Sequence, residues 1–185
     1  MPNLAFRLKK RPDANVMLTL VRDDGTFTNG PLGPAAGYGP VHDLAHYVVE
    51  STLSLSEGFL GLVASGWAIG DFEMKGAAGV LPHEALFAEG AAGELSRQEM
   101  MHQPSTAEEF NWALGAMLAA AGRTEYAQPH VDAATLDTMR ATLIGLRRRW
   151  NELPPSATLE LSFHSARRSN CVPPAAPGQG RSTRT

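Results

Sequence analysis

Two histidines and two carboxylates fall within the nine residues from His42 to Glu50, in a stretch whose other residues are compatible with a helix. Histidines four positions apart lie one turn apart on one face of a helix, so the imidazoles of His42 and His46 can bind a single metal ion. Asp43 would then lie beside the metal-bound water and accept its proton. This spacing predicts a metal site that carries its own general base.

Glu50 shares the same face of the helix but lies too far along it to bind the same ion easily. At the helical rise per residue, it is about 12 Å along the axis from His42. We therefore expect Glu50 to bond the second ring nitrogen of His46 and so to fix the orientation of that ring. Only if the helix ends or bends between the two residues would Glu50 become a ligand itself.

A third protein ligand would have to come from outside this helix. The pair His83-Glu84, at the start of a later expected helix, is the favoured source. Zinc is the expected ion, because imidazole and carboxylate groups suit it. The full set of candidates for the third ligand is Glu57, Asp71, Glu73, His83, Glu84 and His102.

The pattern His-Asp-x-x-His resembles the His-Glu-x-x-His active-site helix of the zincin metallopeptidases. The resemblance covers His42 to His46, with Glu50 as an extension. It implies that both histidines are zinc ligands and that Asp43 takes the place of the family's catalytic Glu. Asp is one methylene shorter, and a misplacement of about 1 Å can cost about a hundredfold in rate. The resemblance therefore implies metal binding more strongly than peptide hydrolysis.

Other interpretations of this helix remain open at this point. In one of them its polar face is no site and simply faces water, with His46 and Glu50 forming a weak i,i+4 pair. Alternatively, the protein is a non-catalytic metal-binding module, or an interaction or regulatory module, with a homodimer through its last helix as one form. The sequence does not identify a substrate, whether small molecule or peptide.

Composition limits the class of protein further. The chain has 185 residues, of which 43% are hydrophobic and 19% charged, with a net charge of −3, as is ordinary for one globular domain. Nothing in this balance indicates a nucleic-acid partner. Cys171 is the single cysteine, and no segment reads as a signal peptide or membrane span, so we expect a cytoplasmic protein with no membrane partner.

The order of expected elements predicts an α+β fold, in which a small antiparallel sheet packs on a bundle of four to five helices. The sheet is expected from an N-terminal hairpin and a C-terminal strand. A glycine- and proline-rich loop is expected to lead into the histidine helix. The expected ranges are strands 4–8, 16–21, 26–28 and 159–163, a loop 29–40, and helices 42–52, 56–67, 82–101 with a break near Gly90 or Gly93, 106–122 after a capping box at Ser105–Glu108, and 132–153.

Residues 1–168 are expected to form this single domain. Residues 169–185 are rich in Pro, Gly, Ser and Arg, and such a composition cannot bury enough apolar surface to become ordered. We therefore predict a disordered and dispensable tail after Arg168.

Overall fold

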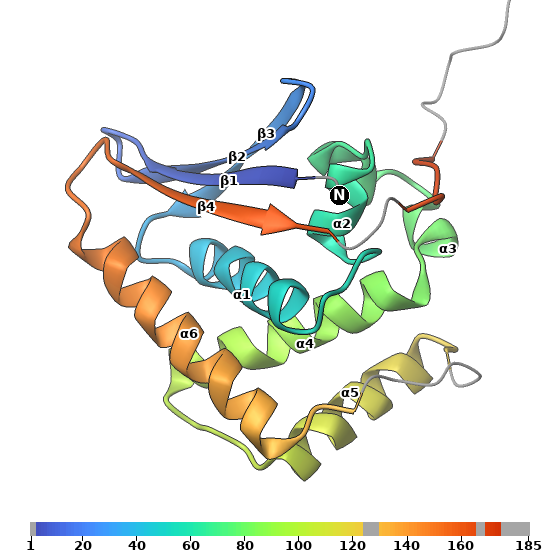
Figure 1. The fold of residues 1–185 in the computed structure, drawn as a ribbon. Coiled ribbons are helices and arrows are strands. Elements are labelled where there is room, and N and C mark those ends of the chain that lie inside the picture. Colours follow the sequence, from blue (N-terminus) through green and yellow to red (C-terminus); the bar gives the residue numbers. More distant parts are fainter. Residues whose placement is uncertain (1–2, 124–129, 166–168, 175–185) are drawn as a thin grey trace, which may run out of the picture.

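The sheet unites the two ends of the domain. A computed structural model describes residues 3–123, 130–165 and 169–174. Its strands are β1 (Asn3–Lys10), β2 (Asn15–Arg22), β3 (Phe27–Pro34) and β4 (Thr158–His164), in the order β3-β2-β1-β4 with every neighbouring pair antiparallel. The C-terminal strand pairs with β1, where Phe6 lies opposite Leu161 (Figure 1). The predicted α+β fold is confirmed.

One face of the sheet forms the core. Alternate residues of β1, β2 and β4 are buried, as the period of two predicts for a half-buried sheet. Helices α1 (Tyr38–Thr52) and α2 (Phe59–Ala64) contact the strands from this side. The buried strand residues are Leu4, Phe6, Leu8, Val16, Leu18, Leu20, Leu159, Leu161 and Phe163.

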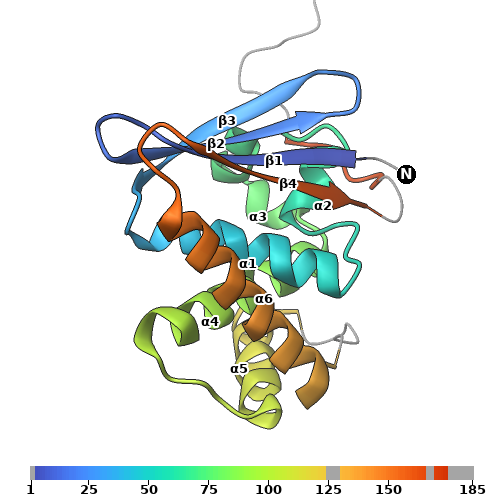
Figure 2. The same cartoon turned by 60° about the vertical axis from the view of Figure 1, so that its left-hand side comes forward.

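The remaining helices follow α2 in the chain. After α2 come a 3-10 helix η1 (Ile69–Glu73), α3 (Ala77–Val80), α4 (His83–Met101), α5 (Ala107–Ala120) and α6 (Ala133–Glu152). Helix α1 packs on α4 and α6, and α5 packs on α4 (Figure 2). No helix in the described ranges is both long enough and apolar enough to cross a membrane.

The apolar stripe of the last helix lies in the core. Its members are buried against the rest of the same chain. They are Leu136, Met139, Leu143, Leu146 and Trp150.

The expected loop between residues 29 and 40 is wrong for its first half. Strand β3 continues to Pro34, although Pro31 and Pro34 have no N–H to donate. A proline is tolerated here because β3 is an edge strand, and one side of it needs no partner. The helix that follows begins at Tyr38 rather than at His42, with Pro40 in its first turn, where amide groups have no intrahelical partner.

Three helices also differ from the predicted ranges. Helix α2 covers only residues 59–64 of the expected 56–67. Helix α4 runs unbroken through Gly90 and Gly93, and at Gly90 a side chain would overlap the Cε of Met117, so the glycine permits close packing of α4 on α5. The capping box before α5 is formed by Thr106 and Glu109, one residue later than expected, because the same pattern occurs in two overlapping frames.

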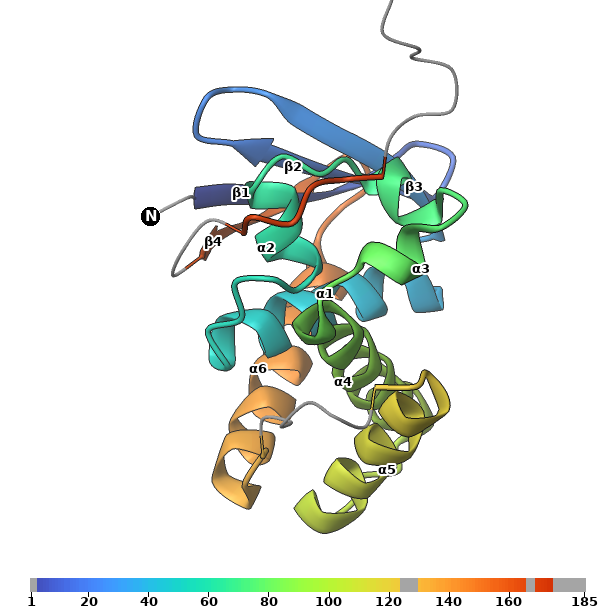
Figure 3. The ribbon, with the colours of Figure 1, turned by 90° about the vertical axis from the view of Figure 1, so that its right-hand side faces the viewer.

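Residues 169–174 make contacts that their composition does not predict. The Ser169 amide donates to Ser65 Oγ at 2.8 Å, and the Trp67 indole N–H donates to the Cys171 carbonyl at 2.9 Å. The segment runs across α2 toward α3 (Figure 3). The expectation of a tail with nothing to dock against therefore does not hold for these residues, whereas residues 175–185 lie outside the described ranges.

Candidate metal centre

The polar face of α1 is turned inward. Asp43, His46 and Glu50 are 8%, 3% and 0% exposed. Helix α1 is covered on this side by α2 and α4, so these side chains cannot be a solvated helix face. The interpretation of this motif as a surface i,i+4 pair is wrong.

Both ring nitrogens of His46 meet carboxylates. Nδ1 lies 3.1 Å from Glu50 Oε1, and Nε2 lies 3.1 Å from Oε2 of Glu89 on α4. Burial by itself favours the neutral ring, but hydrogen bonds to Glu50 and Glu89 outweigh it and raise the pKa of His46 to about 10. Both carboxylates therefore favour the protonated form of this ring.

Glu50 links the histidine to the next helix. Its Oε2 accepts hydrogen bonds from the amides of Leu60 at 2.9 Å and Gly61 at 3.2 Å, in the first turn of α2. The N-cap of α2 is Gly58, which has no side chain to cap those amides, so Glu50 does it from α1. A Cβ at Gly58 would lie 2.5 Å from Glu50 Cδ, so only glycine leaves room for the carboxylate. The contact with His46 Nδ1 is the one expected from the sequence.

His42 is held in a similar way. Its Nε2 lies 3.4 Å from Glu89 Oε1, and its Nδ1 lies 3.0 Å from the hydroxyl of Tyr38, one turn earlier. The Tyr38 ring stacks on the imidazole, and its hydroxyl accepts a hydrogen bond from Ser96 on α4 at 3.0 Å. Each histidine thus has one nitrogen fixed by its own helix and the other directed at Glu89.

Within the described ranges, His42, His46 and Glu89 form the one cluster of three groups able to hold a metal ion. One ligand atom from each lies within 4.8 Å of the others. Ligands of a tetrahedral zinc ion, each about 2.1 Å from the metal, are about 3.4 Å from one another. The Nε2 atoms of His46 and His42 lie close to this value, at 3.1 and 3.4 Å, from different oxygens of Glu89, Oε2 and Oε1. Two imidazoles and a carboxylate are groups that bind divalent metal ions such as zinc.

Asp43 faces the cavity beside this cluster. Its Oδ2 is buried and makes no hydrogen bond to any described residue. Burial raises the pKa of Asp43 to about 6, although the charges of His46 and His42 oppose the shift. A buried carboxylate with a free oxygen can take up and return a proton near neutral pH.

The two favoured sources of a third ligand lie elsewhere. The Glu84 carboxylate accepts a hydrogen bond from the Glu57 amide at 2.6 Å, and neither His83 nor Glu84 belongs to the ligand cluster. Glu89 was not among the candidates, because no short spacing in the sequence relates it to His42 or His46. One signal was available: Glu89 is the single charged residue between Glu84 and Glu94, in a run of alanine, glycine, leucine and phenylalanine.

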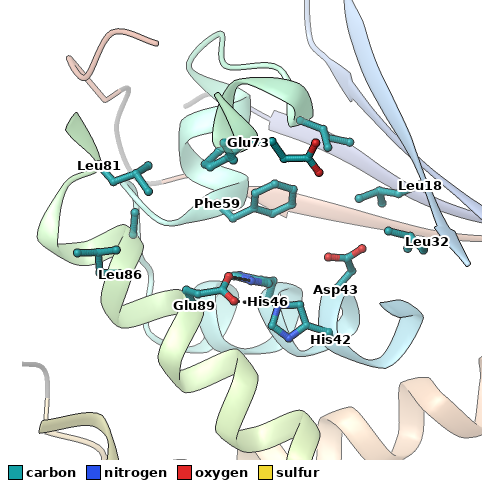
Figure 4. A pocket seen from close by; sticks show the side chains of 13 residues that line it. Leu18, Leu32, His42, Asp43, His46, Phe59, Glu73, Leu81, Leu86 and Glu89 are labelled. Carbon is teal, nitrogen blue, oxygen red and sulfur yellow. Dashed lines mark hydrogen bonds and ion pairs between the residues drawn. The ribbon is translucent and has the colours of Figure 1, made fainter. Parts of the chain in front are cut away.

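A cavity of about 350 Å³ opens over the cluster. Figure 4 shows Glu89, His46 and His42 together on one side of its floor, with the Asp43 carboxylate pointing into it from α1. Phe59 lies above them, and its ring centre is 5.3 Å from that of His46. The arrangement gives two nitrogens, a carboxylate and a separate proton acceptor around one space.

Comparison with protein-family models, with curated proteins and with solved structures gave no match for this chain.

Proposed function

We propose that this protein is a zinc-dependent hydrolase with His42, His46 and Glu89 as ligands and Asp43 as general base. The observation that carries the proposal is the cluster of three ligand atoms within 4.8 Å of one another, on two packed helices. Glu50 and Tyr38 support it, because groups that hold the second nitrogen of a ligating histidine fix its tautomer and direction.

A zinc ion bound there would supply a Lewis acid and lower the pKa of a bound water to about 7. The chain supplies the rest. Asp43 accepts the proton of the attacking water at its unpartnered oxygen and returns it to the leaving group. Glu50 keeps Nδ1 of His46 protonated, so that Nε2 is the nitrogen free to bind.

Zinc titration of metal-stripped protein tests the ligand set. We expect one zinc per chain in the wild type, and a loss of at least a hundredfold in affinity in His42→Ala, His46→Ala and Glu89→Gln. Competition with a coloured chelator measures the affinities. His130→Ala, at an exposed position outside the site, is the matched control and should bind zinc like the wild type. Equal zinc binding by the wild type and all three ligand variants would exclude the proposed site.

A further inference from the structure

Most of the residues that line the cavity above the proposed site are apolar. They come from both layers of the molecule, since β2, β3, α2, η1 and α4 each contribute. A cavity of 150 Å³ is enough to hold benzene, so the 350 Å³ here hold a group at least as large as an aromatic ring. The main apolar wall residues are Phe72 and, labelled in Figure 4, Leu18, Leu32, Phe59, Leu81 and Leu86.

Apart from the two histidines, the ionisable groups that line the cavity are all acidic. They are Asp43, Glu73 and Glu89, and none of the described lining residues is Lys or Arg. Glu73 is exposed on η1, across the cavity from Asp43 (Figure 4). The proposed zinc ion would hold the group that is hydrolysed, so a phosphate, sulfate or carboxylate elsewhere on the substrate would lie among apolar side chains with no Lys or Arg beside it, which is unfavourable.

From these two observations we propose that the substrate is an uncharged carboxylic ester or amide, with an apolar group that fills this cavity. This inference rests on the proposed hydrolase function and names its substrate class. In the reaction one water is consumed. Its oxygen bonds to the carbonyl carbon, the C–O or C–N bond breaks, and its proton passes through Asp43 to the leaving alcohol or amine.

A series of hydroxamates on the zinc-loaded protein tests the substrate class. Hydroxamates bind zinc through two oxygens, so their other end reports on the cavity. From acetohydroxamate to hexanohydroxamate, affinity should rise by up to about fourfold for each added methylene. Succinic acid monohydroxamate should bind at least ten times more weakly than butyrohydroxamate, its uncharged counterpart with the same number of carbon atoms.

Three variants locate the effect. Leu86→Gln places a polar group in the wall and should flatten the dependence on chain length while zinc affinity stays unchanged. Ile144→Gln, on the exposed side of α6, is its control and should keep the full dependence. Glu73→Gln changes an exposed residue at the rim, and it should reduce the discrimination against the succinic probe.

The outcomes separate this inference from the proposed function. Absence of zinc binding in the wild type would overturn the hydrolase itself. If zinc binds but affinity is independent of chain length, or the anionic probe binds as tightly as its uncharged counterpart, the site stands and the substrate class is wrong. Loss of the chain-length dependence in Ile144→Gln as well as in Leu86→Gln would also overturn it.

Discussion

Asp43 is the residue that distinguishes a hydrolase from a protein that only binds metal. It lies next in sequence to one proposed ligand, yet its own Oδ2 bonds to no described residue. A buried carboxylate left without a partner costs free energy, and such a cost is typical of a group kept for chemistry. The shorter side chain is compatible with a role as base because it points directly into the cavity (Figure 4).

Asp43→Asn should keep zinc and lose hydrolysis. The amide has nearly the same size but cannot accept the proton, so we expect unchanged zinc affinity and a fall of about 10²–10⁴ in kcat, the usual contribution of a general base. Hydrolysis of an uncharged ester such as a nitrophenyl hexanoate measures it. Asp137→Asn, which removes an exposed carboxylate on α6, serves as control. Wild-type turnover by Asp43→Asn would mean that another group takes the proton.

At this scale the sequence predicts what depends on helical spacing and misses what depends on tertiary packing. The contact between His46 and Glu50 follows from the i,i+4 interval, and it is present. Glu89 is 43 residues beyond His46 and meets it only because α4 packs on α1. No local rule relates those two positions. The prediction of His83 and Glu84 as third ligands rested only on their place at the start of an expected helix.

At the scale of elements, Glu50 joins two helices into one support for the site. One oxygen orients His46 from the same helix, and the other caps the first turn of α2 through Leu60 and Gly61. Phe59, at the start of α2, packs on the His46 ring. The position of α2, and with it a wall of the cavity, is therefore coupled to the position of His46.

Glu50→Gln should weaken zinc binding by about 10–100-fold, as is usual when the partner of a ligating histidine is altered. The amide removes the charge that holds Nδ1–H and puts an NH2 group close to the α2 amides. Chelator competition measures the affinity, and thermal melting verifies that the variant is folded. Glu84→Gln is the control. It changes a carboxylate in the first turn of α4 that accepts a hydrogen bond from the Glu57 amide, and it should leave zinc affinity unchanged. Unchanged affinity in Glu50→Gln, or an equal loss in both variants, would contradict the role given to Glu50.

The elements themselves were predictable where a period was clear. Alternation marked β1 and β4, a β-prone run marked β2, and the 3-4 spacing from Leu136 to Trp150 marked α6. Strand β3 has four glycine or proline residues among its last five and no clear alternation, so its extended conformation depends on pairing with β2. The short α2 likewise depends on a cap from another helix, which no local pattern reveals.

At the scale of the whole molecule, two late segments of the chain lie against the layers that form the site. Strand β4 pairs with β1, and residues 169–174 cross α2 (Figure 3). Trp67, which is buried, packs against Phe72 in the cavity wall and donates its indole N–H to the Cys171 carbonyl. Residues 169–174 therefore back the wall of the cavity from outside.

Truncation before residues 169–174 and truncation after them are expected to change stability differently. A chain that ends at Arg168 loses the hydrogen bonds of Ser169 and Cys171 to Ser65, Glu57 and Trp67, each worth about 0.5–1.5 kcal/mol. After the entropy of ordering the segment is subtracted, we expect a net loss of about 1–2 kcal/mol, or about 2–8 °C in Tm for a chain of this size. A chain that ends at Pro174 keeps these contacts and should melt like the full-length protein.

Calorimetry of the three lengths, at equal concentration and without metal, measures the difference. Ser169→Ala in the full-length chain is a milder test, because it removes only the hydroxyl that donates to Glu57 Oε1 at 3.1 Å and accepts from the Cys171 amide at 3.0 Å, and it should lower Tm by less than the truncation at Arg168. Equal melting of all three lengths would show that the segment adds no net stability, as its composition alone predicts. A drop only in the chain that ends at Arg168 would instead place residues 169–174 within the folded domain, where the hydrogen bond from Trp67 to the Cys171 carbonyl supports the cavity wall.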